Sequence, residues 1–127
     1  MELVLPQLGL PKEQYRTDDR LKEIHFGEWE GLTWREIAGK DPEGLERRKA
    51  DPWNFTPPAN GENYHMLAER VLPFLNELKR DSVIVSHGGI GRTLLALVAQ
   101  WDKRKAPLED IFQGQILLFK NGAALWT

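Results

Sequence analysis

The segment 82–92, Ser-Val-Ile-Val-Ser-His-Gly-Gly-Ile-Gly-Arg, constrains the fold of this chain more than any other. Its first five residues are small or β-branched, which predicts a buried strand over 82–86. His87 and the three glycines predict a turn, and the apolar residues that follow predict a helix over 92–101. A strand that leads through glycines into a helix is typical of α/β folds, which bind ligands at the carboxyl ends of strands.

His87 is therefore the first candidate for a functional residue. The glycines beside it let a ligand approach the backbone, and the first N–H groups of the following helix favour an anion such as phosphate. The sequence is not a Walker phosphate loop, because no Lys-Ser or Lys-Thr pair follows the glycines. A histidine bonded only to nearby backbone is the alternative interpretation.

The rest of the pattern predicts an α/β chain with a mixed sheet. Thr33 and Glu36 have the spacing of a capping box, and Asn121-Gly122 is a strong hairpin signal. The expected elements are a helix end over 1–9 closed by Gly9, a strand or extended segment over 19–26, helices over 33–39, 42–50 and 62–80, and strands over 111–119 and 123–126.

Glu23 is the second candidate residue. If Leu21 and Ile24 point into the core, Glu23 lies at the end of an extended segment, close to a glycine turn. A carboxylic acid with a raised pKa at such a place can protonate a leaving group. On its own, a solvated glutamate is the more common interpretation, and it holds for Glu28 and Glu30 as well.

The composition excludes several kinds of site. With no cysteine among 127 residues, the chain has no disulfide, thiolate zinc site or cysteine nucleophile. Its three histidines stand too far apart for a paired metal-ligand spacing, so we expect neither a metal nor a cofactor. A net charge of −2 gives no basic surface for nucleic acid or membranes. Without a signal peptide, a cytoplasmic location is expected.

Five tryptophans are present, and three of them lie in the loop-rich part of the chain: Trp29, Trp34 and Trp53. Large aromatic side chains usually pack into the core, and here they could instead line a pocket.

Three motifs, in this order, resemble the histidine phosphatase (phosphoglycerate mutase-like) superfamily. They are 20–31 (RLKEIHFGEWEG), 57–63 (PPANGEN, with Asn63 where serine is usual) and 86–92 (SHGGIGR). The resemblance covers essentially the whole chain but only the C-terminal portion of the family's domain. It implies a single domain over 1–127 with an incomplete three-layer α/β/α fold, whose mixed sheet lacks its first strands.

In that family, a first histidine in an Arg-His-Gly motif attacks phosphorus and becomes a phosphohistidine. Arginines and a second histidine hold the phosphoryl oxygens, and a glutamate protonates the leaving oxygen. The resemblance implies that His87 is the second histidine, Glu23 the proton donor and Gly88 a backbone N–H donor, with Glu62 at the entrance. The implied partner is a phosphorylated small molecule or phosphate.

No Arg-His-Gly occurs in this sequence, whose only His-Gly pair follows Ser86. We therefore expect an N-terminally truncated phosphatase domain that is inactive on its own. The strand over 82–86 would lose a neighbour, which favours a homo-oligomer, with domain swapping as one route.

The function expected from the resemblance is phosphomonoester hydrolysis by the complete domain. Three alternatives stay open: a non-catalytic phosphate-binding or interaction module, phosphoryl transfer of the phosphoglycerate mutase type, and an unrelated metal-dependent hydrolase. The scattered histidines oppose the last of these. The short connection between Gly31 and Gly61 favours a phosphatase over a mutase.

Overall fold

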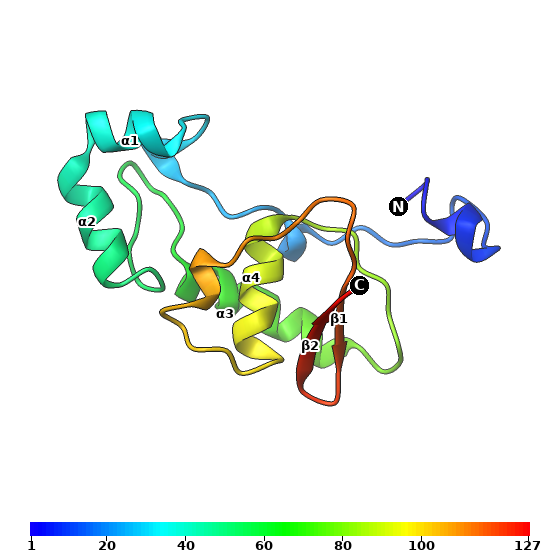
Figure 1. The fold of residues 1–127 in the computed structure, drawn as a ribbon. Coiled ribbons are helices and arrows are strands. Elements are labelled where there is room, and N and C mark those ends of the chain that lie inside the picture. The colour runs from blue at the N-terminus through cyan, green and yellow to red at the C-terminus, as the bar shows by residue number, and fades with distance from the viewer.

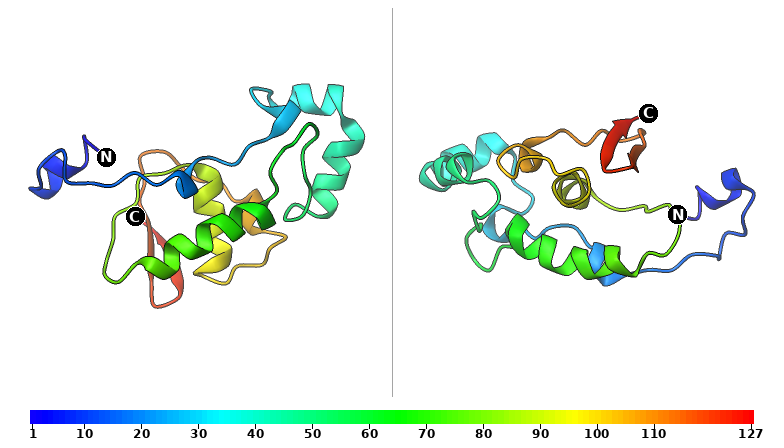
Figure 2. Two further views of the ribbon diagram at one scale, coloured as in Figure 1. Left: turned by 180° about the vertical axis from the view of Figure 1, so that it is seen from behind. Right: turned by 90° about the horizontal axis from the view of Figure 1, so that it is seen from below.

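The computed structural model describes residues 1–127, and most of its regular structure is helical (Figures 1 and 2). Its α-helices are α1 (Trp34–Lys40), α2 (Pro42–Ala50), α3 (Tyr64–Glu77) and α4 (Gly88–Leu97), followed by strands β1 (Leu117–Lys120) and β2 (Ala123–Trp126). Short 3-10 turns are η1 (Leu5–Leu8), η2 (Asp19–Leu21), η3 (Gly27–Trp29) and η4 (Ala106–Leu108). No helix has both the length and the apolar character needed to cross a bilayer.

Residues 1–18 form an arm that extends away from the helices (Figure 1). The helix end expected over 1–9 is only the short turn η1, which has Pro6 in its first turn. Gly9 caps it, as predicted, in the left-handed conformation at φ +70°. Leu3 on this arm is 87% exposed, so the arm contributes little apolar burial.

The helices α1 and α2 form where the sequence predicts them. Thr33 caps α1 by accepting a hydrogen bond from the Glu36 backbone N–H at 3.3 Å, and the Glu36 carboxylate accepts one from the Thr33 N–H at 2.7 Å. Asp41 caps α2 by accepting from the Gly44 N–H at 2.9 Å, and Pro42 follows the cap. Both predictions are confirmed because these signals act within a few residues of chain.

The core lies where α3 and α4 pack against each other (Figure 2). The extended segment 22–26 joins them through Ile24, which is almost fully buried. Pro73 lies inside α3 without ending it, and the helix stops at Glu77 rather than at 80. The core cluster consists of Ile24, Trp53, Tyr64, Leu67, Ala68, Val71, Ile90 and Leu94.

The prediction of a buried strand over 82–86 is wrong. This segment is an irregular connection between α3 and α4 (Figure 1), and Val83 and Val85 are 60% and 52% exposed. Residues 79–86 make no backbone–backbone hydrogen bond. The β-branched sequence favours an extended backbone, but a strand also needs a neighbour, and the structure supplies none.

The hairpin at 117–126 is confirmed. Lys120 pairs with Ala123 across the two-residue turn Asn121-Gly122, in which both residues have positive φ, +52° and +73°. The first strand is shorter than the expected 111–119 and begins at Leu117. This two-stranded antiparallel pair is the only sheet, so the expected mixed sheet and three-layer arrangement do not form within residues 1–127.

Of the two alternatives predicted for 19–26, a strand or an extended segment, the structure contains no strand. The segment starts as the turn η2 and continues without regular structure from Lys22, which is extended, to the next turn, and it carries a cluster of ion pairs at its start. Arg20 donates to Asp18 at 2.7 and 2.9 Å and to Glu77 at 2.7 and 2.8 Å, which ties this segment to the end of α3.

These ion pairs predict how stability depends on pH. Hydrogen bonds from Arg20 lower the pKa of Asp18 to about 2 and also lower the pKa of Glu77. A carboxyl whose pKa is lower in the folded state stabilises the fold above its unfolded pKa of about 4. That stabilisation is lost as the pH falls through the folded pKa.

Asp18→Asn is therefore expected to lower the melting temperature near neutral pH. The difference from wild type should shrink steadily between about pH 5 and about pH 2 in thermal unfolding followed by circular dichroism. Asp19→Asn is the matched control, because Asp19 pairs only with exposed Lys22 at 3.3 Å. A difference that stays constant down to about pH 2 would contradict the assignment.

Candidate functional site

The start of α4 is the centre of the candidate site. The helix begins at Gly88, four residues earlier than the predicted start at Arg92, so the glycines form its first turn. His87 is the extended residue just before the helix (φ −120°, ψ 168°), and its exposed side chain makes no capping hydrogen bond. The orphan N–H groups of this first turn make it a favourable position for an anion.

Glu23 occupies that position. Its carboxylate oxygens lie 3.0 and 3.3 Å from the backbone nitrogen of Gly89, and one of them also accepts from the Ile24 N–H at 2.9 Å. A carboxylate at a helix N-terminus is stabilised by the helix dipole. The structure thus brings Glu23 and His87 to the same helix end, while their catalytic roles stay predictions.

Gly89 permits this approach. A Cβ built on Gly89 would meet Glu23 Oε1 at 2.3 Å and Ile24 Cγ2 at 2.8 Å. Gly88, in contrast, is half-buried beside Arg92, whose Nη1 atom would lie 3.3 Å from a Cβ at that position. The expected contact of the Gly88 N–H with a phosphate remains a prediction.

Gly89→Ala is expected to destabilise the protein by roughly 1–3 kcal/mol, because the methyl group displaces Glu23 and Ile24. Gly39→Ala is the matched control, since Gly39 lies in α1 with nothing within 4 Å of its Cβ position. The free energy of unfolding of that variant should instead rise by about 0.5–1 kcal/mol, because alanine has a higher helix propensity than glycine. Urea unfolding of the two variants measures both effects, and equal effects would contradict the packing at Gly89.

Glu62 is held by Arg70 from α3. The Arg70 guanidinium donates to the two carboxylate oxygens at 2.7 and 2.9 Å, and the Glu62 N–H donates to the carbonyl of His25. Arg70 also donates to the backbone carbonyls of 20, 22 and 23. Glu62 therefore joins two segments of the site, and its place at an entrance remains a prediction.

A cavity of about 240 Å³ beside α4 contains residues to which the sequence alone assigned no role. Arg92 from α4 borders it, as do Arg48 from α2 and Tyr64 from the start of α3. Its remaining lining residues are Phe26, Trp34, Pro107, Leu108 and Asp110. Arg48, Tyr64 and Arg92 lie on three different helices, far apart in the sequence, so no local sequence pattern could have grouped them.

Two polar groups of this cavity, those of Arg48 and Tyr64, have few partners within the chain, whereas Arg92 Nε donates to the Glu109 carbonyl at 2.7 Å. The Tyr64 hydroxyl is buried and makes no hydrogen bond, and Arg48, only 8% exposed, makes a single long one of 3.5 Å to the Pro107 carbonyl. Burial raises the pKa of the Tyr64 phenol, against the opposing effect of Arg92 and Arg48. Burial also lowers the pKa of Arg48. An anionic ligand would compensate both arginines and accept from the phenol.

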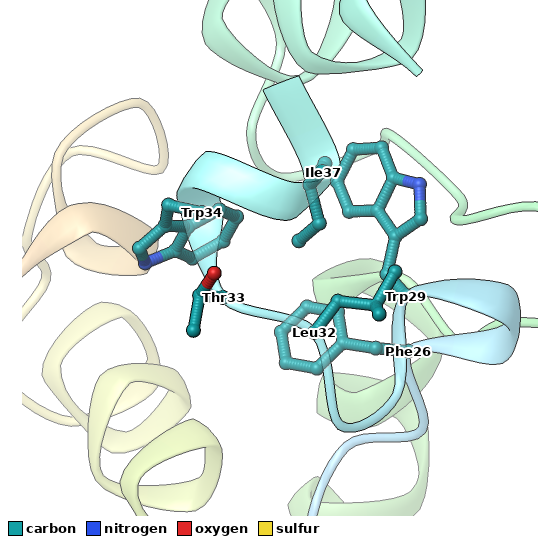
Figure 3. A pocket seen from close by; sticks show the side chains of 6 residues that line it. All are labelled: Phe26, Trp29, Leu32, Thr33, Trp34 and Ile37. Atoms are coloured by element: carbon teal, nitrogen blue, oxygen red, sulfur yellow. The ribbon is translucent and has the colours of Figure 1, made fainter. Parts of the chain in front are cut away.

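A second cavity of about 340 Å³ shares Phe26 and Trp34 with the first, and Figure 3 shows the side chains that line it. Trp29, Leu32 and Ile37 contribute most of the remaining wall, and the lining is almost entirely apolar. Trp29 and Trp34 thus line pockets, whereas Trp53 belongs to the core. The second cavity is lined by no positively charged residue that could balance a phosphate.

Comparison with known proteins identifies similar chains. One is a 6-phosphofructo-2-kinase/fructose-2,6-bisphosphatase of Arabidopsis thaliana, 34% identical over 103 residues, which are 79% of this chain and 13% of that protein. The corresponding protein of Gallus gallus is 32% identical over 102 residues, 79% of this chain and 21% of its own length. A metal-independent phosphoserine phosphatase of Arabidopsis thaliana is 31% identical over 85 residues, 63% of this chain and 36% of its own.

The chain therefore spans between about an eighth and about a third of these relatives' lengths. Residues 1–120 match the family model of the histidine phosphatase superfamily (branch 1). Since that match covers all three motifs, and two of them meet at the start of α4, the chain belongs to the histidine phosphatase superfamily.

Proposed function

We propose that this chain supplies the second-histidine and proton-donor side of a phosphomonoesterase site. The observation that carries the proposal is the contact of the Glu23 carboxylate with the Gly89 N–H at 3.0 Å, two residues after His87. Through this contact, Glu23 and His87, the acid and the second histidine of the expected mechanism, lie at the same end of α4. In that mechanism, the phosphoryl group passes to a first histidine, and Glu23 gives a proton to the leaving oxygen.

The cavity beside α4 indicates a substrate with a second anionic group. Arg48 and Arg92 supply two positive charges against the single negative charge of Asp110, and the Tyr64 hydroxyl supplies an unused donor. The names of the relatives agree with this class of substrate. A fructose bisphosphate carries a second phosphate and phosphoserine a carboxylate, each besides the group that is removed. We therefore propose a small phosphomonoester with a second anionic group as the ligand.

Phosphate and the Glu23 carboxylate compete for the same helix end. Two like charges a few ångströms apart repel each other strongly where water is partly excluded. Phosphate binding at this helix end thus requires the Glu23 carboxylate to move away from the Gly89 N–H. Glu23→Gln should accordingly bind phosphate several-fold more tightly than wild type.

The 127 residues themselves are proposed to bind phosphate without turning over a phosphomonoester. The reason is that they contain no Arg-His-Gly to supply the nucleophile. The same observation favours a second candidate function, a phosphate-binding module without catalysis. Phosphoryl transfer of the mutase type would need the same missing nucleophile.

Calorimetric titration with inorganic phosphate tests the proposal. His87→Ala is expected to weaken binding at least tenfold, whereas His65→Ala, an exposed position on α3, leaves it unchanged. In parallel, p-nitrophenyl phosphate should not be hydrolysed above the buffer rate by the wild-type chain. Absence of phosphate binding would overturn the proposed site, and hydrolysis that His87→Ala abolishes would make His87 a nucleophile instead.

A further inference from the structure

The second cavity has no part in the function proposed so far. Its volume is about 340 Å³, and in Figure 3 Trp34 and Trp29 stand on opposite sides of it, with Phe26 and Leu32 below Ile37. An apolar cavity of about 150 Å³ can hold a benzene molecule, and the ligand pockets of proteins begin at about 300 Å³. The second cavity is therefore large enough for an aromatic ring.

Packing within the chain fixes the walls of the second cavity. Trp29 and Ile37 are each only 3% exposed, so both are held firmly by their neighbours. The Trp29 indole donates a hydrogen bond to the Asp41 carboxylate at 3.2 Å, and its ring centre lies 5.0 Å from that of Phe55. A cavity whose walls are already ordered binds a ligand at a smaller entropic cost than one that must form on binding.

Trp34 lies where the second cavity meets the cavity beside α4, because it lines both. It is 53% exposed, and an exposed aromatic face is a surface on which a flat apolar group can stack. The guanidinium carbon of Arg48 lies 4.6 Å from the centre of the Trp34 ring. A ligand anion that pairs with Arg48 is thus close to Trp34, and the group next to that anion lies beside the second cavity.

The parts of the candidate site therefore follow one another in space. The first turn of α4 is the proposed place of the reacting phosphate, and Arg92, about one turn further along the helix, borders the cavity beside α4. Phe26 and Trp34 connect that cavity to the second one. A ligand that reaches all three places carries a phosphate, then a second anionic group, then an apolar group.

We propose that the substrate carries an apolar group, such as an aromatic ring, beyond its second anionic group, and that this group binds in the second cavity. The inference rests on the proposed function, because it concerns the far end of the same ligand. It makes Leu32 and Trp34 determinants of specificity, although neither contacts the reacting phosphate. The affinity comes from removing apolar surface of both ligand and cavity from water.

Two ligands that differ only in their apolar group test the inference. N-acetyl-O-phosphoserine and N-benzoyl-O-phosphoserine both carry a phosphate and a carboxylate, and a phenyl ring in the second replaces a methyl group in the first. In calorimetric titrations of the whole chain, the benzoyl compound should bind at least about tenfold more tightly than the acetyl compound. This comparison uses the wild-type chain alone, so it does not depend on how a variant folds.

The variant Leu32→Asn tests where the ring binds. Leu32 lines the second cavity but not the cavity beside α4, and asparagine has a similar size but is polar. This variant should therefore lose most of the preference for the benzoyl compound and keep its affinity for the acetyl compound. Leu72→Asn is the matched control, because Leu72 is an exposed residue on α3 that lines neither cavity. It should keep the wild-type preference.

The outcomes distinguish this inference from the proposed function. If inorganic phosphate and the acetyl compound bind, but the benzoyl compound binds no more tightly, the inference is overturned and the proposed function stands. A preference that Leu32→Asn leaves intact means that the ring binds elsewhere, which also overturns the inference. If neither phosphate nor either compound binds, the proposed function fails and the inference fails with it.

Discussion

Replacing Leu67 with alanine is expected to lower the free energy of unfolding by about 2–5 kcal/mol. Leu67 lies on α3 at the centre of the core, with none of its surface exposed, in one cluster with Ile24 and Ile90. The shorter side chain loses its own burial and leaves a cavity between α3 and α4. Because typical domains are stable by only about 5–15 kcal/mol, this loss is a large share of the total.

Equilibrium unfolding in urea measures the effect. Met66→Ala is the matched control, since Met66 precedes Leu67 on the same helix but is 46% exposed, and its substitution should change stability by less than about 1 kcal/mol. Leu67→Met keeps the volume and should cost less than about 1.5 kcal/mol, so an effect is measurable even if the alanine variant does not fold. An alanine variant as stable as wild type would be incompatible with this core.

Replacing Arg70 with alanine is expected to destabilise the protein by roughly 3 kcal/mol and to loosen the candidate site. The guanidinium of Arg70 holds the carboxylate of Glu62, whose side chain is only 17% exposed, and binds the backbone carbonyls of 20, 22 and 23. Without it, the carboxylate and these carbonyls lose their partner at once. Because Arg70 also holds the backbone of Glu23, the expected proton donor, its loss should weaken phosphate binding as well.

The variant Arg70→Lys tests whether the positive charge at position 70 or the planar hydrogen-bonding geometry of the guanidinium stabilises the protein. A lysine keeps the positive charge but cannot donate to both carboxylate oxygens and three carbonyls from one planar group. We expect it to recover less than half of the stability lost in the alanine variant. Arg35→Ala, at an exposed position of α1 without a hydrogen bond, is the control and should behave like wild type. Full recovery by lysine would show that charge alone matters at this position.

Local signals in the sequence predicted local structure well. The capping pair Thr33–Glu36, the helix over 42–50 and the Asn121-Gly122 turn all occur in the structure as predicted. Each signal depends on atoms within a few residues of one another, so it can be read from the local sequence. The same is true of Gly9, whose lack of a side chain permits the left-handed cap.

The strand over 82–86 shows where such signals fail. Its composition favours an extended backbone, but whether that backbone becomes a strand depends on a second segment to pair with. In the structure no part of residues 1–127 pairs with it, and Val83 and Val85 remain exposed. The helix after it starts at Gly88 rather than at Arg92, because Glu23 caps the first turn from far away in the sequence.

The sequence by itself determined the family, through three motifs in order, and the identity of the candidate residues Glu23, Glu62, His87 and Gly88. Only the tertiary structure decided what these residues touch. In the structure, the Glu23 carboxylate accepts a hydrogen bond from the Gly89 N–H, and the Glu62 carboxylate accepts one from Arg70. The tertiary structure also gathered Arg48, Tyr64 and Arg92 around one cavity. The physical reason is that motifs record residue types at short spacing, whereas contacts between distant segments arise only when packing brings them together.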